Sequence, residues 1–168
     1  MNSKIIKIIL WTAVILWMVL IFMFSAENAE ESIETSDGIV DIVVDHVLAD
    51  KKETMDEEEF LKIKEQISHF IRKSAHFSLY TVLGILVMCT IMQYSKRYSV
   101  SFPISSSICI LYAATDEIHQ IFVPGRAGSI FDVFIDSSGS LSGIMIVFLA
   151  VTLFKNISSK KKIPPNGD

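Results

Sequence analysis

The stretch SAHFSLYTVLGILVMCTIMQY, residues 74–94, decides the fold class of this chain. It runs for 21 residues without an aspartate, glutamate, lysine or arginine. A helix that crosses a bilayer needs roughly 20 mainly apolar residues. A segment of this length and composition therefore predicts a membrane-spanning helix.

Three other stretches are equally free of those charged residues: Ile8–Phe24 with 17 residues, and Tyr98–Thr115 and Ser137–Phe154 with 18 each. The last extends upstream to Ile130 if two aspartates are allowed inside the membrane. The first is longer than the roughly 7–15 apolar residues of a signal peptide, which favours a retained helix. Several serines make 98–115 the least apolar of the four.

The sequence therefore predicts an all-α membrane protein in which one domain, residues 1–168, contains four transmembrane helices. The expected helices cover about 5–24, 73–94, 98–116 and 130–154. An outer loop at 25–72 separates the first two, and a cytoplasmic tail is expected at 155–168.

Lysine and arginine predict the orientation. They occur before the first helix, between the second and third, and after the fourth, at Lys4, Lys7, Lys96, Arg97 and Lys155. Cytoplasmic loops are enriched in these residues, and the three places alternate correctly to share one side. We expect both termini in the cytoplasm and the other two loops outside, although two basic residues at the outer end of the second helix run against the rule.

The outer loop is strongly acidic. Residues 25–69 contain 14 aspartates and glutamates against four lysines, a net charge of −10, whereas the whole chain carries −4. Apolar residues recur at helical spacing in two parts of this loop, around Val40–Leu48 and Phe60–Ile71. This pattern predicts short amphipathic helices rather than a plain solvated loop, the second of them running into the next span with or without a break.

Polar residues form stripes at the outer ends of three predicted helices. Lys73, His76 and Tyr80 share one helical face, and so do Asp132 and Asp136. The third helix ends in Asp116, Glu117, His119 and Gln120, after which Pro124-Gly125 predicts a turn and Arg126 follows. Ionisable groups in a membrane cost about 2.5–3.5 kcal/mol each on insertion scales, so they are expected to face one another. The stripes predict one polar site near the extracytoplasmic surface, or a salt-bridge network that only holds the helices together.

Two segments carry a family resemblance. RKSAHFSLYTVLGIL (72–86) and DEIHQIFVPGRAGSIFDVFIDSSGSLSG (116–143) resemble the VanZ-like family of bacterial membrane proteins, and FSAENAEESIETS (24–36) is similar to its first outer segment. Members often have an asparagine near 136–138; this chain has none, so Asp132 is given more weight than Asp136. The resemblance implies these ligand-binding positions: Lys73, His76, Tyr80, Asp116, Glu117, Gln120, Arg126 and Asp132.

The resemblance also implies a multi-pass protein of the cell envelope, associated with resistance to teicoplanin, a lipoglycopeptide antibiotic. The residues leave several functions open. Lys73 and Arg126 suit the anionic head group of a membrane lipid or of a lipid-linked cell-wall precursor. A membrane enzyme is the alternative, with His76, Asp116, Glu117 or His119 as catalytic groups.

Such an enzyme could use a divalent metal, and the candidate ligands are Asp116, Glu117, His119 and Asp132. A structural partner of envelope machinery, acting through the acidic loop, is a further alternative. A transporter ranks last, because the polar residues cluster near one face of the membrane. No nucleic-acid partner is expected, and a homo-oligomer is compatible with so thin a bundle.

Overall fold

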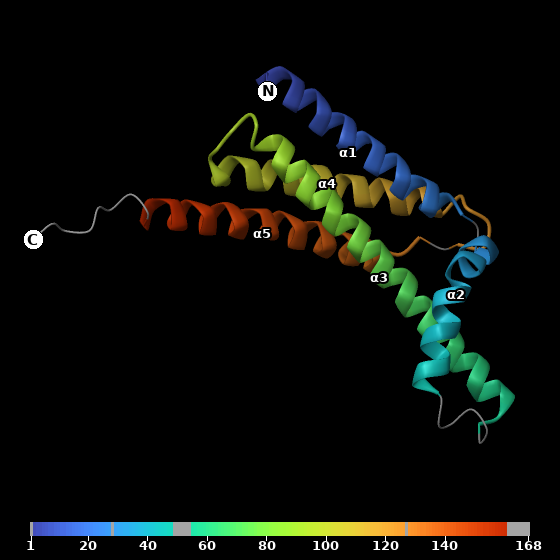
Figure 1. Cartoon of the computed structure of the whole chain (residues 1–168). Coiled ribbons are helices and arrows are strands. Elements are labelled where there is room, and N and C mark those ends of the chain that lie inside the picture. The colour runs from blue at the N-terminus through green and yellow to red at the C-terminus, as the bar shows by residue number, and fades with distance from the viewer. Residues whose placement is uncertain (1, 28, 49–54, 127, 161–168) are drawn as a thin grey trace, which may run out of the picture.

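The computed structural model describes residues 2–27, 29–48, 55–126 and 128–160. Within these residues the chain forms only helices: α1 (Ser3–Ala26), α2 (Ala29–Val47), α3 (Glu57–Ile91), α4 (Tyr98–Gln120) and α5 (Ile130–Lys160). Figure 1 shows a bundle of α1, α4, α5 and the later part of α3, from which α2 and the start of α3 extend as an arm. The predicted all-α class is confirmed.

Side-chain caps begin three of the helices where the sequence supplies a suitable residue. The carboxylate of Asp56 accepts a hydrogen bond of 2.7 Å from the backbone N–H of Glu59 at the start of α3. Asn2 caps α1 by accepting from the N–H of Lys4 at 3.2 Å, and the hydroxyl oxygen of Ser129 accepts from the N–H of Phe131 at 3.2 Å. Such caps satisfy backbone donors that have no partner within the helix.

Helix α3 is longer than the span that hydropathy predicts. Its 35 residues correspond to about 52 Å at 1.5 Å per residue, against about 30 Å for the hydrocarbon core of a bilayer. Hydropathy delimits the apolar part at 73–94, whereas the helix itself begins at Glu57 and continues without a break. The added turns belong to the arm.

The arm is a pair of amphipathic helices, as the apolar spacing predicts. Val40 and Val44 of α2, and Leu48 directly after it, are buried against the first part of α3, where Phe60 and Ile63 are among their partners. An ion pair of 2.8 Å between Lys64 and Asp41 joins the two helices at the surface. The acidic segment is therefore folded along α3 through its apolar face.

Three helices are long and apolar enough to cross a membrane among the described residues. They are α1, α3 and the part of α5 at Ile130–Ser158, with mean hydropathies of 2.6, 1.7 and 1.9 over their best windows. Many of their apolar side chains point outward; Leu16 is 64 % exposed and Met23 66 %. An outward apolar surface of this kind suits lipid, not water. Helix α4 packs against α1, α3 and α5 but falls below the same hydropathy limit.

Glycines let α3 and α5 approach closely. A Cβ atom at Gly84 would collide with the carbonyl oxygen of Ser140, and one at Gly143 with that of Thr81. Gly139 meets the carbonyl oxygen of Phe77 in the same way. These small-residue contacts, which are typical of membrane helices, set the register in which the two helices pack.

The ends of the bundle agree with the predicted alternation. The N-terminus, the α3–α4 connection and the end of α5 lie together at one end of the bundle (Figure 1). The α1–α2 and α4–α5 connections and the arm lie at the other end. The polar stripes of the sequence are found at this second end.

Candidate functional site

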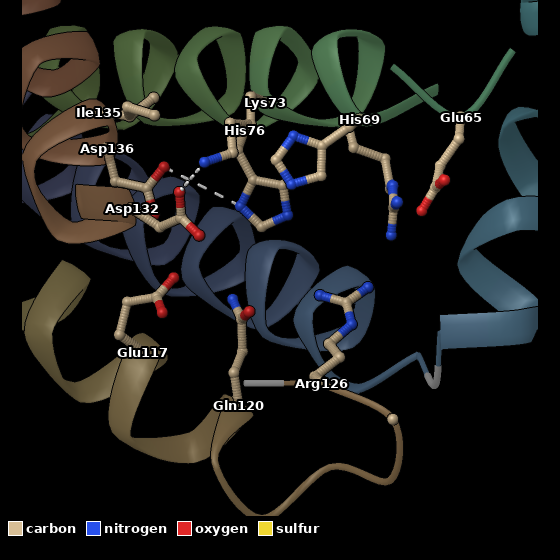
Figure 2. Close-up of a pocket in the computed structure, with 12 residues that line it drawn as sticks. Glu65, His69, Lys73, His76, Glu117, Gln120, Arg126, Asp132, Ile135 and Asp136 are labelled. Atoms are coloured by element: carbon tan, nitrogen blue, oxygen red, sulfur yellow. Dashed lines mark hydrogen bonds and ion pairs between the residues drawn. The ribbon is translucent and has the colours of Figure 1, made fainter. Parts of the chain in front are cut away.

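A polar cavity of about 430 Å³ lies where the middle of α3 meets the end of α4 and the start of α5. Figure 2 shows Lys73 and His76 of α3 pointing toward Asp132 and Asp136 of α5, with Arg126 reaching up from the α4–α5 connection. The residues that line the cavity come from these elements: Glu65, His69, Arg72, Lys73, His76, Glu117, Gln120, Gly125, Arg126, Asp132, Ile135 and Asp136. The predicted stripes therefore do converge.

The first contact across the cavity is an ion pair. The Nζ atom of Lys73 donates to Oδ1 of Asp132 at 2.5 Å. Both side chains are about one third exposed, at 33 % and 29 %. Because each charge already has a partner, Lys73 is a weaker anchor for an external anion than the sequence indicates.

A buried network holds Asp116. Its Oδ2 atom accepts hydrogen bonds from the hydroxyl of Ser25 at 2.8 Å and from that of Tyr80 at 3.2 Å. The Nε2 atom of Gln120 in turn donates to the oxygen of Ser25 at 2.7 Å. The network ties the end of α1 to α3 and α4, and it leaves the other carboxylate oxygen of Asp116 buried without a hydrogen-bond partner.

The turn between α4 and α5 is built as the Pro124-Gly125 pair predicts. Gly125 has a φ of 75°, a left-handed conformation that favours glycine. Glu117 braces the far side of the turn, since its Oε2 atom accepts the backbone N–H of Ser129 at 2.9 Å. Glu117 therefore stabilises the connection between α4 and α5, from which Arg126 reaches the cavity.

Two arginines stand at this mouth. The Nη2 atom of Arg126 donates a long hydrogen bond of 3.4 Å to the carbonyl oxygen of Phe24. The Nε atoms of Arg126 and of Arg72 are buried and have no hydrogen-bond partner within the described part of the chain. Burial, followed by the neighbouring positive charge of Arg72, lowers the pKa of Arg126. The two guanidinium groups therefore lie close together at the mouth, where Glu27, Asp116 and Glu117 are the acidic groups that act on Arg126.

An apolar groove adjoins the polar cavity at the same arginines. Arg72, Arg126 and His76 line both spaces. The rest of the groove is mainly apolar, with one acidic residue, and is formed by the end of α1, the arm and α3: Trp17, Phe24, Glu27, Ile39, Ile71, Ala75, Ser78, Leu79 and Val82. A charged cavity thus continues into an apolar channel of about 480 Å³ on the outer surface of the helices.

Deeper in the cavity, three potential metal ligands from three helices meet. His76 of α3, Asp116 of α4 and Asp136 of α5 each offer one ligand atom, and these atoms lie within 4.8 Å of one another. The Nδ1 atom of His76 lies 4.0 Å from Oδ1 of Asp136 (Figure 2). This set shares only Asp116 with the four metal candidates drawn from the sequence.

The other candidates lie elsewhere. His119 stacks on Phe22 of α1 with ring centroids 4.3 Å apart, Glu117 bonds to the turn, and Asp132 pairs with Lys73. Asp136, given less weight than Asp132 from the sequence, is the more deeply buried of the two, with 1 % exposure. Sequence reasoning also missed Ser25 and Arg72 as members of the site, because neither belongs to a polar stripe.

An all-helical fold, apolar helices of membrane-spanning length and a polar site among their ends fit the class of multi-pass membrane proteins. The family model VanZ/LLP1 matches residues 10–153, which is most of the chain. The chain therefore belongs to the VanZ/LLP1 family. Comparison with curated proteins and with solved structures gives no match.

Proposed function

We propose that this protein crosses the bacterial cell membrane four times and binds the anionic head group of a lipid at its extracytoplasmic surface. Helix α4 serves as the fourth span, because residues 98–115 carry no charge and α4 packs within the bundle. The start of α1, the α3–α4 connection and the end of α5, which carry Lys4, Lys7, Lys96, Arg97 and Lys155, lie at one end of the bundle (Figure 1), and the positive-inside rule assigns this end to the cytoplasm. The polar cavity then opens on the outer side.

The observation that supports a lipid ligand is the junction of the polar cavity with the apolar groove. Lipids and lipid-linked cell-wall precursors combine a phosphate with long hydrocarbon chains. The groove suits a chain, and the two arginines at the junction suit a phosphate, which guanidinium groups bind with paired hydrogen bonds. Neither arginine forms a salt bridge within the described residues, so both remain available.

This assignment moves the anion-binding role from Lys73 to Arg72. Lys73 is neutralised by Asp132, and an incoming phosphate would have to compete with that carboxylate. Arg126 keeps the role that the sequence indicates. A site of this kind would bind or reposition a precursor at the outer leaflet, which is the target region of lipoglycopeptides such as teicoplanin, and this links the site to the resistance associated with the family.

The test compares purified protein variants in nanodiscs for retention of a polyprenyl phosphate and of phosphatidylglycerol, with phosphatidylcholine as the reference lipid. Replacing Arg72 or Arg126 by alanine should weaken retention of the phosphate-bearing lipid about 10- to 100-fold, as expected for losing a charge-assisted hydrogen bond of about 1.5–3 kcal/mol. The two anionic lipids distinguish a precursor from an ordinary phospholipid.

Arg97 provides the matched control, because it is an exposed arginine at the opposite end of the bundle. Arg97→Ala should retain lipid as the wild type does. Equal retention by Arg72→Ala, Arg126→Ala and the control would contradict the proposal. In cells that depend on this protein for teicoplanin resistance, the variants that lose lipid should also lose resistance.

A further inference from the structure

We propose that His76, Asp116 and Asp136 form a binding site for one divalent transition-metal ion of the zinc type. The site does not depend on lipid binding, and it differs from the set of acidic residues and His119 that the sequence indicates. Its three ligands come from α3, α4 and α5, so an ion bound there would join three helices at one point.

Geometry is the first argument. The three ligand atoms lie within 4.8 Å of one another. Around a tetrahedral zinc ion with bonds of 2.0–2.2 Å, neighbouring ligand atoms are about 3.4 Å apart. A contraction of up to about 1.4 Å, within reach of side-chain rotations, would bring the imidazole and both carboxylates to bonding distance.

Unpartnered buried oxygens are the second argument. Asp116 is 2 % exposed and Asp136 is 1 % exposed, yet among the residues that the structure describes Oδ1 of Asp116 and Oδ2 of Asp136 have no hydrogen-bond partner. A buried carboxylate oxygen without a partner costs several kcal/mol. Lys73, the lysine that lines the same cavity, is already bound to Asp132. A divalent cation would balance two carboxylate charges and give each buried carboxylate a partner.

The surroundings hold the proposed ligands in position. Ser25 and Tyr80 both donate to Oδ2 of Asp116, which leaves its other oxygen for the ion. Hydrogen bonds of this kind fix the orientation of metal ligands and are a regular part of metal sites. They also show that Asp116 is not arranged as half of a simple ion pair.

The ligand types select the metal. One imidazole with two carboxylates suits zinc and similar first-row ions, whereas magnesium and calcium prefer oxygen ligands alone. Three protein ligands leave at least one coordination position open, as in catalytic zinc sites. His76 and Asp136 line the polar cavity, so that position would face it and could accept a water or an anionic oxygen.

The experiment measures metal content and affinity of the full-length protein in detergent. The protein is stripped with a chelator, titrated with Zn²⁺ by calorimetry and assayed for bound zinc by mass spectrometry. The wild type should bind about one zinc ion per chain, and His76→Ala and Asp136→Asn should each weaken binding by at least about 100-fold.

Two control variants each replace a side chain of a ligand type, one carboxylate and one histidine, that does not belong to the three-residue cluster. Glu65→Gln alters another carboxylate that lines the same cavity, and His119→Ala alters a histidine that stacks on Phe22 instead. Both should bind zinc as the wild type does. No stoichiometric zinc in the wild type, as expected if Asp116 and Asp136 share a proton instead, would overturn the proposal, and so would equal loss in the controls.

If a ligand variant fails to fold, the wild-type protein can still be tested, because the ligands of its bound zinc can be identified by spectroscopy. X-ray absorption of the zinc-loaded protein should show one imidazole and otherwise oxygen ligands. Sulfur ligands, or no imidazole, would refute the assignment.

Discussion

The close crossing of α3 and α5 gives the sharpest prediction. Gly143→Ala places a methyl group against the carbonyl oxygen of Thr81, at a separation that real Cβ atoms essentially never show. The opposing atom belongs to the backbone of a helix, so no side-chain rotation can relieve the collision. The two helices must move apart at this level by about 1 Å to restore van der Waals contact.

The cost follows from two opposing effects. Overpacking of this kind destabilises a protein by about 1–3 kcal/mol, while alanine gains up to about 1 kcal/mol over glycine in helix propensity. We therefore expect Gly143→Ala to lower the free energy of unfolding by about 1–2 kcal/mol. The outer pairs should loosen too, because the same crossing sets the register of Lys73 with Asp132 and of His76 with Asp136.

Unfolding of the purified protein by SDS in mixed micelles measures this free energy. Gly38→Ala is the matched control, because a Cβ there meets nothing within 4 Å. That variant should be as stable as the wild type or more stable by up to about 1 kcal/mol. If Gly143→Ala unfolds at the same free energy as Gly38→Ala, the close crossing does not determine stability and the reasoning fails.

Two other predictions concern the site and the topology. Ser25→Ala removes a donor to Asp116 and an acceptor for Gln120, so it should destabilise the protein by about 1–3 kcal/mol in the same assay. Ser142→Ala, which only loses a bond to its own helix, should change stability by less than about 0.5 kcal/mol. For the topology, a reporter domain that is active only in the cytoplasm should be active when fused to either terminus. A reporter that is active only outside the membrane should be active when inserted between α1 and α2. Activity of this second reporter at either terminus would contradict the proposed orientation.

Much of the architecture follows from the sequence, because membrane-spanning helices are marked by long stretches without charged residues and amphipathic helices by apolar residues at helical spacing. Charge-free stretches correctly marked the apolar helices, and the valines near Val40 marked α2. Hydropathy could not locate the start of α3 at Glu57, since it detects the part that suits lipid and not the helix that continues beyond it. The apolar spacing at Phe60–Ile71 did predict the second helix of the arm, but it left open whether that helix continues into the span without a break.

The sequence predicted which ends of the helices carry the site, but it did not predict which side chains contact one another there. Spacing puts Asp132 and Asp136 on one face of α5, but it cannot say how far each lies from the cavity mouth. Parallel packing of α3 and α5 decides this: the outer pair is Lys73 with Asp132, and the next turn pairs His76 with Asp136. The register depends on glycine contacts across two helices, which no single-helix pattern contains.

His76 occupies the position where the separate features of this protein meet. It lines the polar cavity and the apolar groove, and it contributes the nitrogen atom of the proposed three-helix metal site. A phosphate held by Arg72 and Arg126 would therefore lie beside the open side of that cluster. Arg72 and His76 lie about one turn apart on α3, so this turn would connect the proposed lipid site to the buried carboxylates. A residue at such a junction is better explained by a ligand than by packing, since packing alone would favour an apolar side chain there.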